Sequence, residues 1–198
     1  MKNDFVFIVG LPRTGTKLVR SILAQSKEPY CVISPEIWFF GDLFRPGLVR
    51  LIKNVGDMHN DENVTSLVEY IYSSKFKRTY YQLLGSGNSK LTKQQLLSLL
   101  FKSDRSNAGI YKALMWAYAS ISQKDIKSQD RIVLGDKTPG NLYFLNNIFQ
   151  WFPDAKVIHT FRDPRAIMAS EWRRVMNIKD KNRFSLLFRP VNAAFIVL

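Results

Sequence analysis

The sequence predicts an α/β fold, in which a P-loop-like parallel sheet is flanked by helices and forms a single domain over residues 1–198. Three observations lead to this prediction. Four short apolar runs have the length and composition of buried parallel strands: residues 5–9, 30–33, 131–134 and 156–161. Segments with helical spacing of apolar residues separate these runs. Each run also ends in a turn marked by Gly or Pro, so helices are expected to begin at one common edge of the sheet.

The first expected strand leads into a loop that reads Gly10-Leu-Pro-Arg-Thr-Gly-Thr-Lys17, followed by an expected helix over residues 15–26. Glycines in such a loop expose backbone N–H groups, and the N-terminus of a helix attracts anions, so the loop is a candidate phosphate or sulfate site. The glycine spacing matches an ATP-binding P-loop. However, Thr-Lys stands where a lysine followed by Ser or Thr is required. The loop therefore predicts an anion site and argues against an ordinary ATPase.

The other three expected strands end in a shared pattern, a good N-cap residue followed by proline. The three pairs are Ser34-Pro35, Thr138-Pro139 and Asp163-Pro164. Proline is favoured at the first position of a helix, so each pair predicts a helix start. Arg162 ends the fourth strand, and Ser170 would lie almost two turns into the next helix. An arginine and a hydroxyl held in this way predict a second phosphate site, and Lys137 is expected on the same edge.

Residues 41–130 predict a helical insertion between the second and third strands. Apolar spacing indicates amphipathic helices over residues 64–84, 92–102 and 108–124, and the Gly- and Ser-rich residues 85–89 separate the first from the second. We expect this insertion to cover the sheet edge and to form a wall for an acceptor substrate. For its individual aromatic residues, simple packing is the expected role.

Composition limits the classes of function. The formal net charge of +13 would attract a nucleic acid, an acidic surface or a polyanionic small molecule, and a plain basic surface explains it equally well. Cys31 is the single cysteine and is expected in a buried strand, so no intramolecular disulfide is possible. A signal-peptide pattern, an apolar run of membrane-spanning length and a metal-binding Cys/His cluster are all missing from the sequence. The expectation is a cytoplasmic protein that needs no metal.

Three segments together resemble the sulfotransferases that use 3′-phosphoadenosine 5′-phosphosulfate (PAPS). The first loop, Pro12-Arg-Thr-Gly-Thr16, is similar to the Pro-Arg-Ser-Gly-Thr loop of one branch of that family, and the segments Asp136-Lys-Thr-Pro139 and Arg162-Asp-Pro-Arg165 follow in the family's order. The resemblance covers residues 5–40 and 131–175. It implies that PAPS is the sulfuryl donor, that PAP is the product, and that no metal takes part.

The resemblance also implies roles for individual residues. The first loop of the family binds the 5′-phosphosulfate, and the Arg-Asp-Pro-Arg segment with its downstream serine holds the 3′-phosphate. The residues implied for the phosphosulfate are Pro12, Arg13, Thr14, Gly15, Thr16 and Lys17. Those implied for the 3′-phosphate are Arg162 and Ser170. Lys17 departs from the family, which usually has a small hydroxyl residue there.

Sulfuryl transfer requires stabilisation of the charge that develops on the leaving phosphate, and donors aimed at such charge often contribute about 3–4 kcal/mol each. Arg13 is the first candidate for this task, with Lys137 and Lys17 as helpers.

The acceptor must also lose a proton, so a general base is expected. Glu36 resembles a glutamate of this branch, although it could instead complement the N-terminus of its own helix. His159 is a rival base, for which a packed strand position is the expected role. Asp136 is expected either to orient Lys137 or to cap the next helix.

Enzymes of this type continue well beyond the Arg-Asp-Pro helix, into a segment that closes over the adenine and the 3′-phosphate. Residue 198 is only some twenty residues past that helix, so the chain is expected to lack this segment. Two other functions remain open. A P-loop nucleotide kinase with a degenerate loop would show Mg²⁺-dependent ATP binding. A non-catalytic basic module would bind nucleic acid or acidic glycans, and its nucleic-acid binding would persist near physiological salt.

The expected partner is a small-molecule or glycan acceptor, with lipids also open. No specific nucleic-acid partner is expected, because the sequence holds no recognised nucleic-acid motif. The sequence carries no signal for an oligomeric state.

Overall fold

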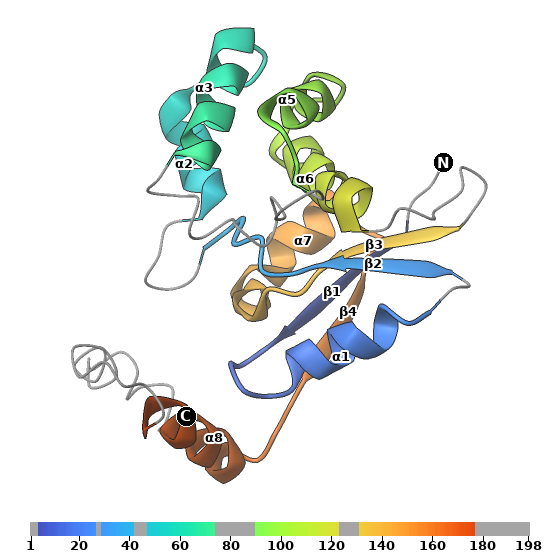
Figure 1. Ribbon diagram of the computed structural model, residues 1–198, viewed down its shortest axis with the longest axis vertical. Coiled ribbons are helices and arrows are strands. Elements are labelled where there is room, and N and C mark those ends of the chain that lie inside the picture. The colour runs from blue at the N-terminus through green and yellow to red at the C-terminus, as the bar shows by residue number, and fades with distance from the viewer. Residues whose placement is uncertain (1–3, 27–28, 42–46, 74–89, 123–130, 177–198) are drawn as a thin grey trace.

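The computed structural model describes residues 4–26, 29–41, 47–73, 90–122 and 131–176 (Figure 1). In this part of the chain, four strands form one sheet in the order β2-β3-β1-β4, and every pair is parallel. The strands are β1 (Asp4–Gly10), β2 (Tyr30–Ser34), β3 (Ile132–Asp136) and β4 (Lys156–Thr160). The predicted parallel α/β fold is therefore confirmed, and the strand bounds differ from the predicted ones by one or two residues.

Alternate side chains of the strands pack on opposite faces of the sheet. Val6 and Ile8 of β1 pack on the face covered by α1 (Thr16–Leu23), whereas Phe7 and Val9 lie in the larger core beneath α6 (Asn107–Ser122) and α7 (Leu145–Trp151) (Figure 1). Cys31 belongs to the α1 side and is buried, as predicted. Burial on both faces explains why the strands read as continuous apolar runs in the sequence.

The residues between β2 and β3 form the predicted helical insertion. Its described helices are α2 (Leu48–Val55), α3 (Asp61–Tyr72), α5 (Lys93–Phe101) and α6. α5 begins with a capping box between Thr92 and Gln95, a strong local start signal. α3 ends at Tyr72, and the rest of the helix predicted over residues 64–84, with the break at 85–89, lies outside the described residues. α2 was not predicted, because eight residues give a short apolar pattern.

Two of the three cap–proline pairs begin a helix and one does not. Pro139 starts a 3₁₀ helix, η2 (Pro139–Phe144), and Pro164 starts α8 (Pro164–Met176), where Asp163 Oδ1 accepts the N–H of Arg165 at 2.8 Å. The helix predicted at Ser34-Pro35 is wrong, since the next described helix begins only at Leu48. The backbone N–H of Ile37 instead donates to a side chain of the neighbouring loop, which removes the need for a helical partner.

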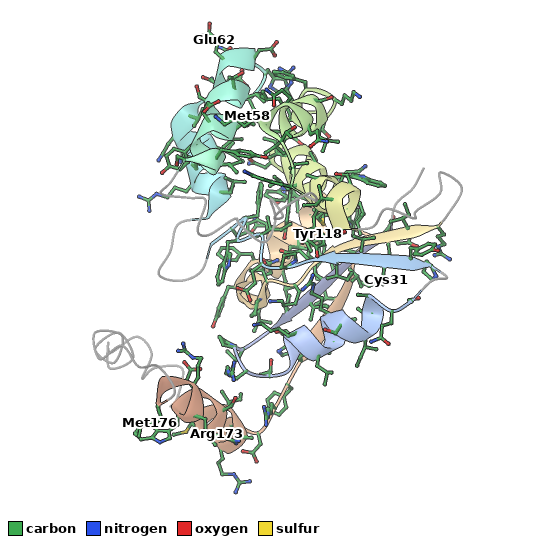
Figure 2. The ribbon with its side chains drawn as sticks, viewed as in Figure 1. Cys31, Met58, Glu62, Tyr118, Arg173 and Met176 are labelled. Atoms are coloured by element: carbon green, nitrogen blue, oxygen red, sulfur yellow. The ribbon has the colours of Figure 1, made fainter. Side chains whose placement is uncertain are left out.

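α8 lies apart from the sheet. None of its described side chains is buried, and Figure 2 places Arg173 and Met176 at the end of the molecule opposite Met58 and Glu62. The described part of the chain contains no helix with the length and apolarity needed to cross a membrane.

Candidate functional site

The predicted site residues follow the carboxyl ends of parallel strands, so they gather at one edge of the sheet. The loop after β1 occupies the centre of this edge, because β1 lies between β3 and β4. Adjacent strands are about 4.8 Å apart, so residues that follow β3, β1 and β4 are neighbours in space although far apart in the chain. This is the edge at which ligands of open α/β sheets bind.

The loop after β1 has an unusual backbone. Gly10 and Gly15 have φ angles of 147° and 102°, and Arg13 has a φ of 71°, in the left-handed region that non-glycine residues rarely enter. Gly15 is also the N-cap of α1, and no side chain caps this helix. Strained residues of this kind concentrate at ligand sites, and an uncapped helix N-terminus is suited to an anion.

Two buried hydroxyl groups hold the loop against β4. Thr14 Oγ1 donates to the carbonyl oxygen of Leu11 at 2.7 Å and forms a hydrogen bond with Thr160 Oγ1 at 2.6 Å. Thr160 Oγ1 also lies 3.2 Å from the carbonyl oxygen of Val9, so its single hydrogen is shared between Thr14 and Val9. The loop is therefore fixed to both β1 and β4, and Gly10, the register partner of Thr160, lies directly beside these groups.

We expect Gly10→Ala to destabilise the protein more than Gly15→Ala. A Cβ at Gly10 would lie 2.6 Å from both the carbonyl oxygen and the Oγ1 of Thr160, whereas a Cβ at Gly15 meets nothing within 4 Å. Both substitutions strain a positive φ, at about 1–2 kcal/mol, and the clash at Gly10 adds about 1–3 kcal/mol. Urea denaturation of both variants measures the difference. Equal losses would contradict the close approach of β4 to Gly10.

Arg13, Arg162 and Ser170 meet although they lie up to 157 residues apart. Arg13 Nε donates to Ser170 Oγ at 3.0 Å, and Arg162 Nη1 donates to the carbonyl oxygen of Arg13 at 3.3 Å. The carboxylate of Glu171 lies 3.9 Å from Arg13 Nε and also pairs with Arg174. The residues predicted for two phosphate sites thus form one exposed cluster, which we call the arginine cluster: Arg13, Arg162 and Ser170.

A second cluster lies at the ends of β2 and β3. Lys137 Nζ donates to Glu36 Oε1 at 2.6 Å, and the side chains are 3% and 31% exposed. The alternative role of Glu36, at the N-terminus of its own helix, is wrong because no helix begins there. The geometry instead gives a buried ammonium group that holds a partly exposed carboxylate at the sheet edge.

Asp136 lies beneath this pair and is completely buried. Its Oδ1 accepts hydrogen bonds from Ser34 Oγ, Thr138 Oγ1 and the N–H of Ile37, and its Oδ2 accepts from the Tyr111 hydroxyl and Asn141 Nδ2. The predicted role of Asp136 in orienting Lys137 stays a prediction, because the two side chains do not contact each other directly. Asp136 does not cap η2, since its carboxylate accepts no backbone N–H of that helix. It is the centre of a polar network that we call the Asp136 network.

Burial raises the pKa of Asp136 from 3.8 to about 6, although its hydrogen bonds act in the opposite direction. Between these values the folded protein keeps a proton that the unfolded chain has released, so rising pH favours unfolding over this range. Two pKa units correspond to about 3 kcal/mol. We expect wild-type stability to fall by up to this amount between about pH 4 and pH 6, relative to Asp136→Asn. Urea denaturation at several pH values measures the difference, and parallel curves for the two proteins would contradict it.

The remaining predicted residues differ in exposure. Thr16 is buried at the start of α1, whereas Pro12 and Lys17 are exposed. His159 is exposed on β4, so the predicted packed position is wrong; within the described part of the chain, β4 is an edge strand of the sheet. Over the described residues, no group of three or more His, Cys, Asp or Glu is placed to hold a metal ion.

Sequence reasoning missed Tyr111 and Asn141. Tyr111 lies within an amphipathic helix, where a tyrosine has the same pattern as any packing aromatic residue. Asn141 lies two residues after the Asp-Lys-Thr-Pro segment, and this nearness in the sequence could have indicated its place in the site.

Comparison with known proteins identifies the family of this chain. The family model described as the sulfotransferase family matches residues 5–189, which includes both clusters and the helical insertion. No curated protein matches the chain. Because the match covers nearly the whole sequence, the chain belongs to the sulfotransferase family, and a sulfotransferase activity in general follows from this membership.

Proposed function

We propose that this protein transfers a sulfuryl group from PAPS to a hydroxyl or amine group of a small-molecule or glycan acceptor, with release of PAP. One observation carries the proposal. The arginine cluster and the Glu36–Lys137 pair lie at the same edge of one parallel sheet, so an anion site adjoins a candidate proton acceptor.

The residues present fit a nucleotide with phosphate groups at two positions. Arg13 follows β1 and lies beside an uncapped helix N-terminus, which is suited to the phosphosulfate. Arg162 and Ser170 follow β4 and are suited to the 3′-phosphate. A guanidinium group has five N–H donors, so Arg13 can keep its bond to Ser170 and still donate to an anion. Thr14, Gly15 and Thr16 complete the proposed phosphosulfate loop, flanked by Pro12 and Lys17.

When bound, PAPS would supply an activated sulfuryl group. The chain's own residues would then perform two tasks. Glu36 takes the proton that the acceptor oxygen or nitrogen loses. Its Oε1 already accepts from Lys137, which fixes the position of the carboxylate, and Oε2 is the oxygen proposed to take the proton. Arg13, with help from Lys137 and Lys17, stabilises the negative charge left on the phosphate oxygen after transfer.

The helical insertion is the proposed acceptor side of a single domain. α6 packs against both β2 and β3, the strands whose ends carry Glu36 and Lys137. The insertion thus lies next to the strands that carry the proposed base, and we propose that its residues select the acceptor.

Calorimetric titration with PAP in the absence of magnesium tests this proposal. We expect binding with a Kd on the order of 1 µM, about −8 kcal/mol, and clearly weaker binding of adenosine 5′-monophosphate, which lacks the 3′-phosphate. Transfer from PAPS to a panel of hydroxyl and amine acceptors follows. Equal affinity for the two nucleotides would contradict the proposed 3′-phosphate site. Magnesium-dependent ATP binding without PAP binding would favour a nucleotide kinase.

A further inference from the structure

We propose that Tyr111 of α6 is a positioning residue for the Glu36–Lys137 pair, acting through the Asp136 network. This inference rests on the proposed function, in which Glu36 accepts the proton of the acceptor. The helical insertion would then have two tasks. It would form the acceptor side of the site, and its helix α6 would hold the Glu36 and Lys137 side chains in position.

The Asp136 network forms hydrogen bonds with residues on both sides of Glu36 in the chain. Ser34 Oγ lies 3.3 Å from Asp136 Oδ1, and the N–H of Ile37 lies 3.4 Å from the same oxygen and 3.1 Å from Thr138 Oγ1. Glu36 is therefore anchored two residues before and one residue after its own position.

The same network also includes the residues on both sides of Lys137. Thr138 Oγ1 donates a hydrogen bond to Asp136 Oδ1 at 2.9 Å. The backbone N–H of Lys137 donates to the carbonyl oxygen of Ser34 at 3.1 Å. The two loops are thus tied together beneath the ion pair. A shift of the Asp136 carboxylate would change the position of Glu36 relative to Lys137.

Tyr111 holds the second oxygen of this carboxylate. Its hydroxyl donates to Asp136 Oδ2 at 2.6 Å and accepts from Asn141 Nδ2 at 3.0 Å. The ring is completely buried and stacks on Phe39, with 4.5 Å between centroids and 9° between planes. Phe40 meets its edge at 5.7 Å. The ring cannot rotate away without breaking these contacts, so the hydroxyl is a fixed donor. Burial and the neighbouring Asp136 raise its pKa well above the ordinary range, which keeps the proton in place.

Packing alone does not explain this arrangement. Phenylalanine would fill the same space, and a buried hydroxyl–carboxylate network is costly to desolvate. Asn141 directs its Nδ2 to both Tyr111 and Asp136, and among buried side-chain polar atoms of the described residues its Oδ1 lacks a hydrogen-bond partner. Groups kept at such a cost point to a geometric requirement, and two groups that adjoin this network along the chain, Glu36 and Lys137, are paired with each other at the sheet edge.

The test compares Tyr111→Phe with Tyr118→Phe. Both tyrosines lie on α6, and each substitution removes one hydroxyl, but the Tyr118 hydroxyl accepts from Arg20 at 2.7 Å and does not touch the network. We expect Tyr111→Phe to lower kcat about tenfold to a hundredfold, because a misplacement of about 1 Å costs this much. The Kd for PAP should stay within about twofold, since the arginine cluster is untouched. Tyr118→Phe should leave both constants unchanged.

A second measurement does not depend on activity. Lys137 is 3% exposed, so an amine-specific reagent should label it slowly, as measured by peptide mass spectrometry with the exposed Lys17 as internal reference. Tyr111→Phe should raise the labelling rate of Lys137 about fivefold or more, because local opening of the loops controls access. Thr138→Val, which removes the hydroxyl that joins Ile37 to Asp136, should do the same and serves if Tyr111→Phe folds poorly.

Two outcomes would overturn the inference. If Tyr111→Phe and Tyr118→Phe change kcat and Lys137 labelling equally, the Tyr111 hydroxyl serves stability alone. If Lys137 labelling is unchanged in both Tyr111→Phe and Thr138→Val, the network does not hold the pair. Failure of the wild-type protein to bind PAP or transfer sulfate would instead reject the proposed function, and the labelling comparison would still decide whether Tyr111 positions the pair.

Discussion

Glu36→Gln should lower kcat for sulfuryl transfer by about 10²- to 10⁴-fold, which is the usual contribution of a positioned general base. The amide has the shape of the carboxylate but cannot take a proton at neutral pH. The Kd for PAP should stay within about twofold, because Glu36 lies at the end of β2 and the arginine cluster follows β1 and β4. Steady-state kinetics with saturating acceptor, together with PAP titration, separate the two effects.

This substitution should also reduce stability. Lys137 is nearly buried, and its ammonium group would lose the only negative charge paired with it among the described residues. Breaking a buried pair on one side costs about 3–5 kcal/mol, and the partial exposure of Glu36 reduces this figure. The matched control is Glu62→Gln, an exposed glutamate of α3 at the far end of the molecule (Figure 2). A Glu36→Gln variant that keeps wild-type kcat while folded would eliminate Glu36 as the base.

Arg162→Ala should abolish the thermal stabilisation that PAP gives to the wild-type protein. A two-pronged arginine–phosphate contact contributes about 3 kcal/mol, so its loss weakens PAP binding roughly a hundredfold. Ligand stabilisation scales with the logarithm of ligand concentration over Kd, so PAP at about 100 times the wild-type Kd should stabilise the variant little. Calorimetric melting with and without PAP measures the shift. The variant also loses the hydrogen bond from Arg162 to the carbonyl oxygen of Arg13.

Arg173→Ala is the control for this prediction. Arg173 is an exposed arginine of α8, and its Nε donates to the carbonyl oxygen of Ala169, within its own helix (Figure 2). Arg162 and Arg173 carry the same positive charge, and Arg162 lies just before the helix that contains Arg173. The Arg173→Ala variant therefore tests whether the overall positive charge of the protein accounts for PAP binding. An equal loss of the PAP shift in both variants would assign binding to net charge, and an unchanged shift in Arg162→Ala would reject the proposed 3′-phosphate site.

The fold was largely predictable because its main elements have local signatures. Buried parallel strands leave continuous apolar runs, and helices such as α5 and α8 begin with capping residues in the adjacent sequence. The cap–proline pattern gave a wrong prediction at Ser34-Pro35. A good N-cap residue and a proline stand there, but no helix begins at that position. There the N–H of Ile37 finds a partner 101 residues away in Thr138, and a tertiary hydrogen bond replaces the local one.

The sequence alone was enough to place Arg13, Lys137 and Arg162 after the carboxyl ends of strands and Ser170 in the helix that follows β4, and from this it predicts a shared anion site. Their partners became visible only in the folded structure. The ion pair between Glu36 and Lys137 and the gathering of Tyr111 and Asn141 around Asp136 join positions from 5 to more than 100 residues apart. The physical reason is that strand and helix signals act over a few neighbouring residues. Hydrogen bonds in a buried network depend on distances that are set only when β2, β3 and α6 pack together.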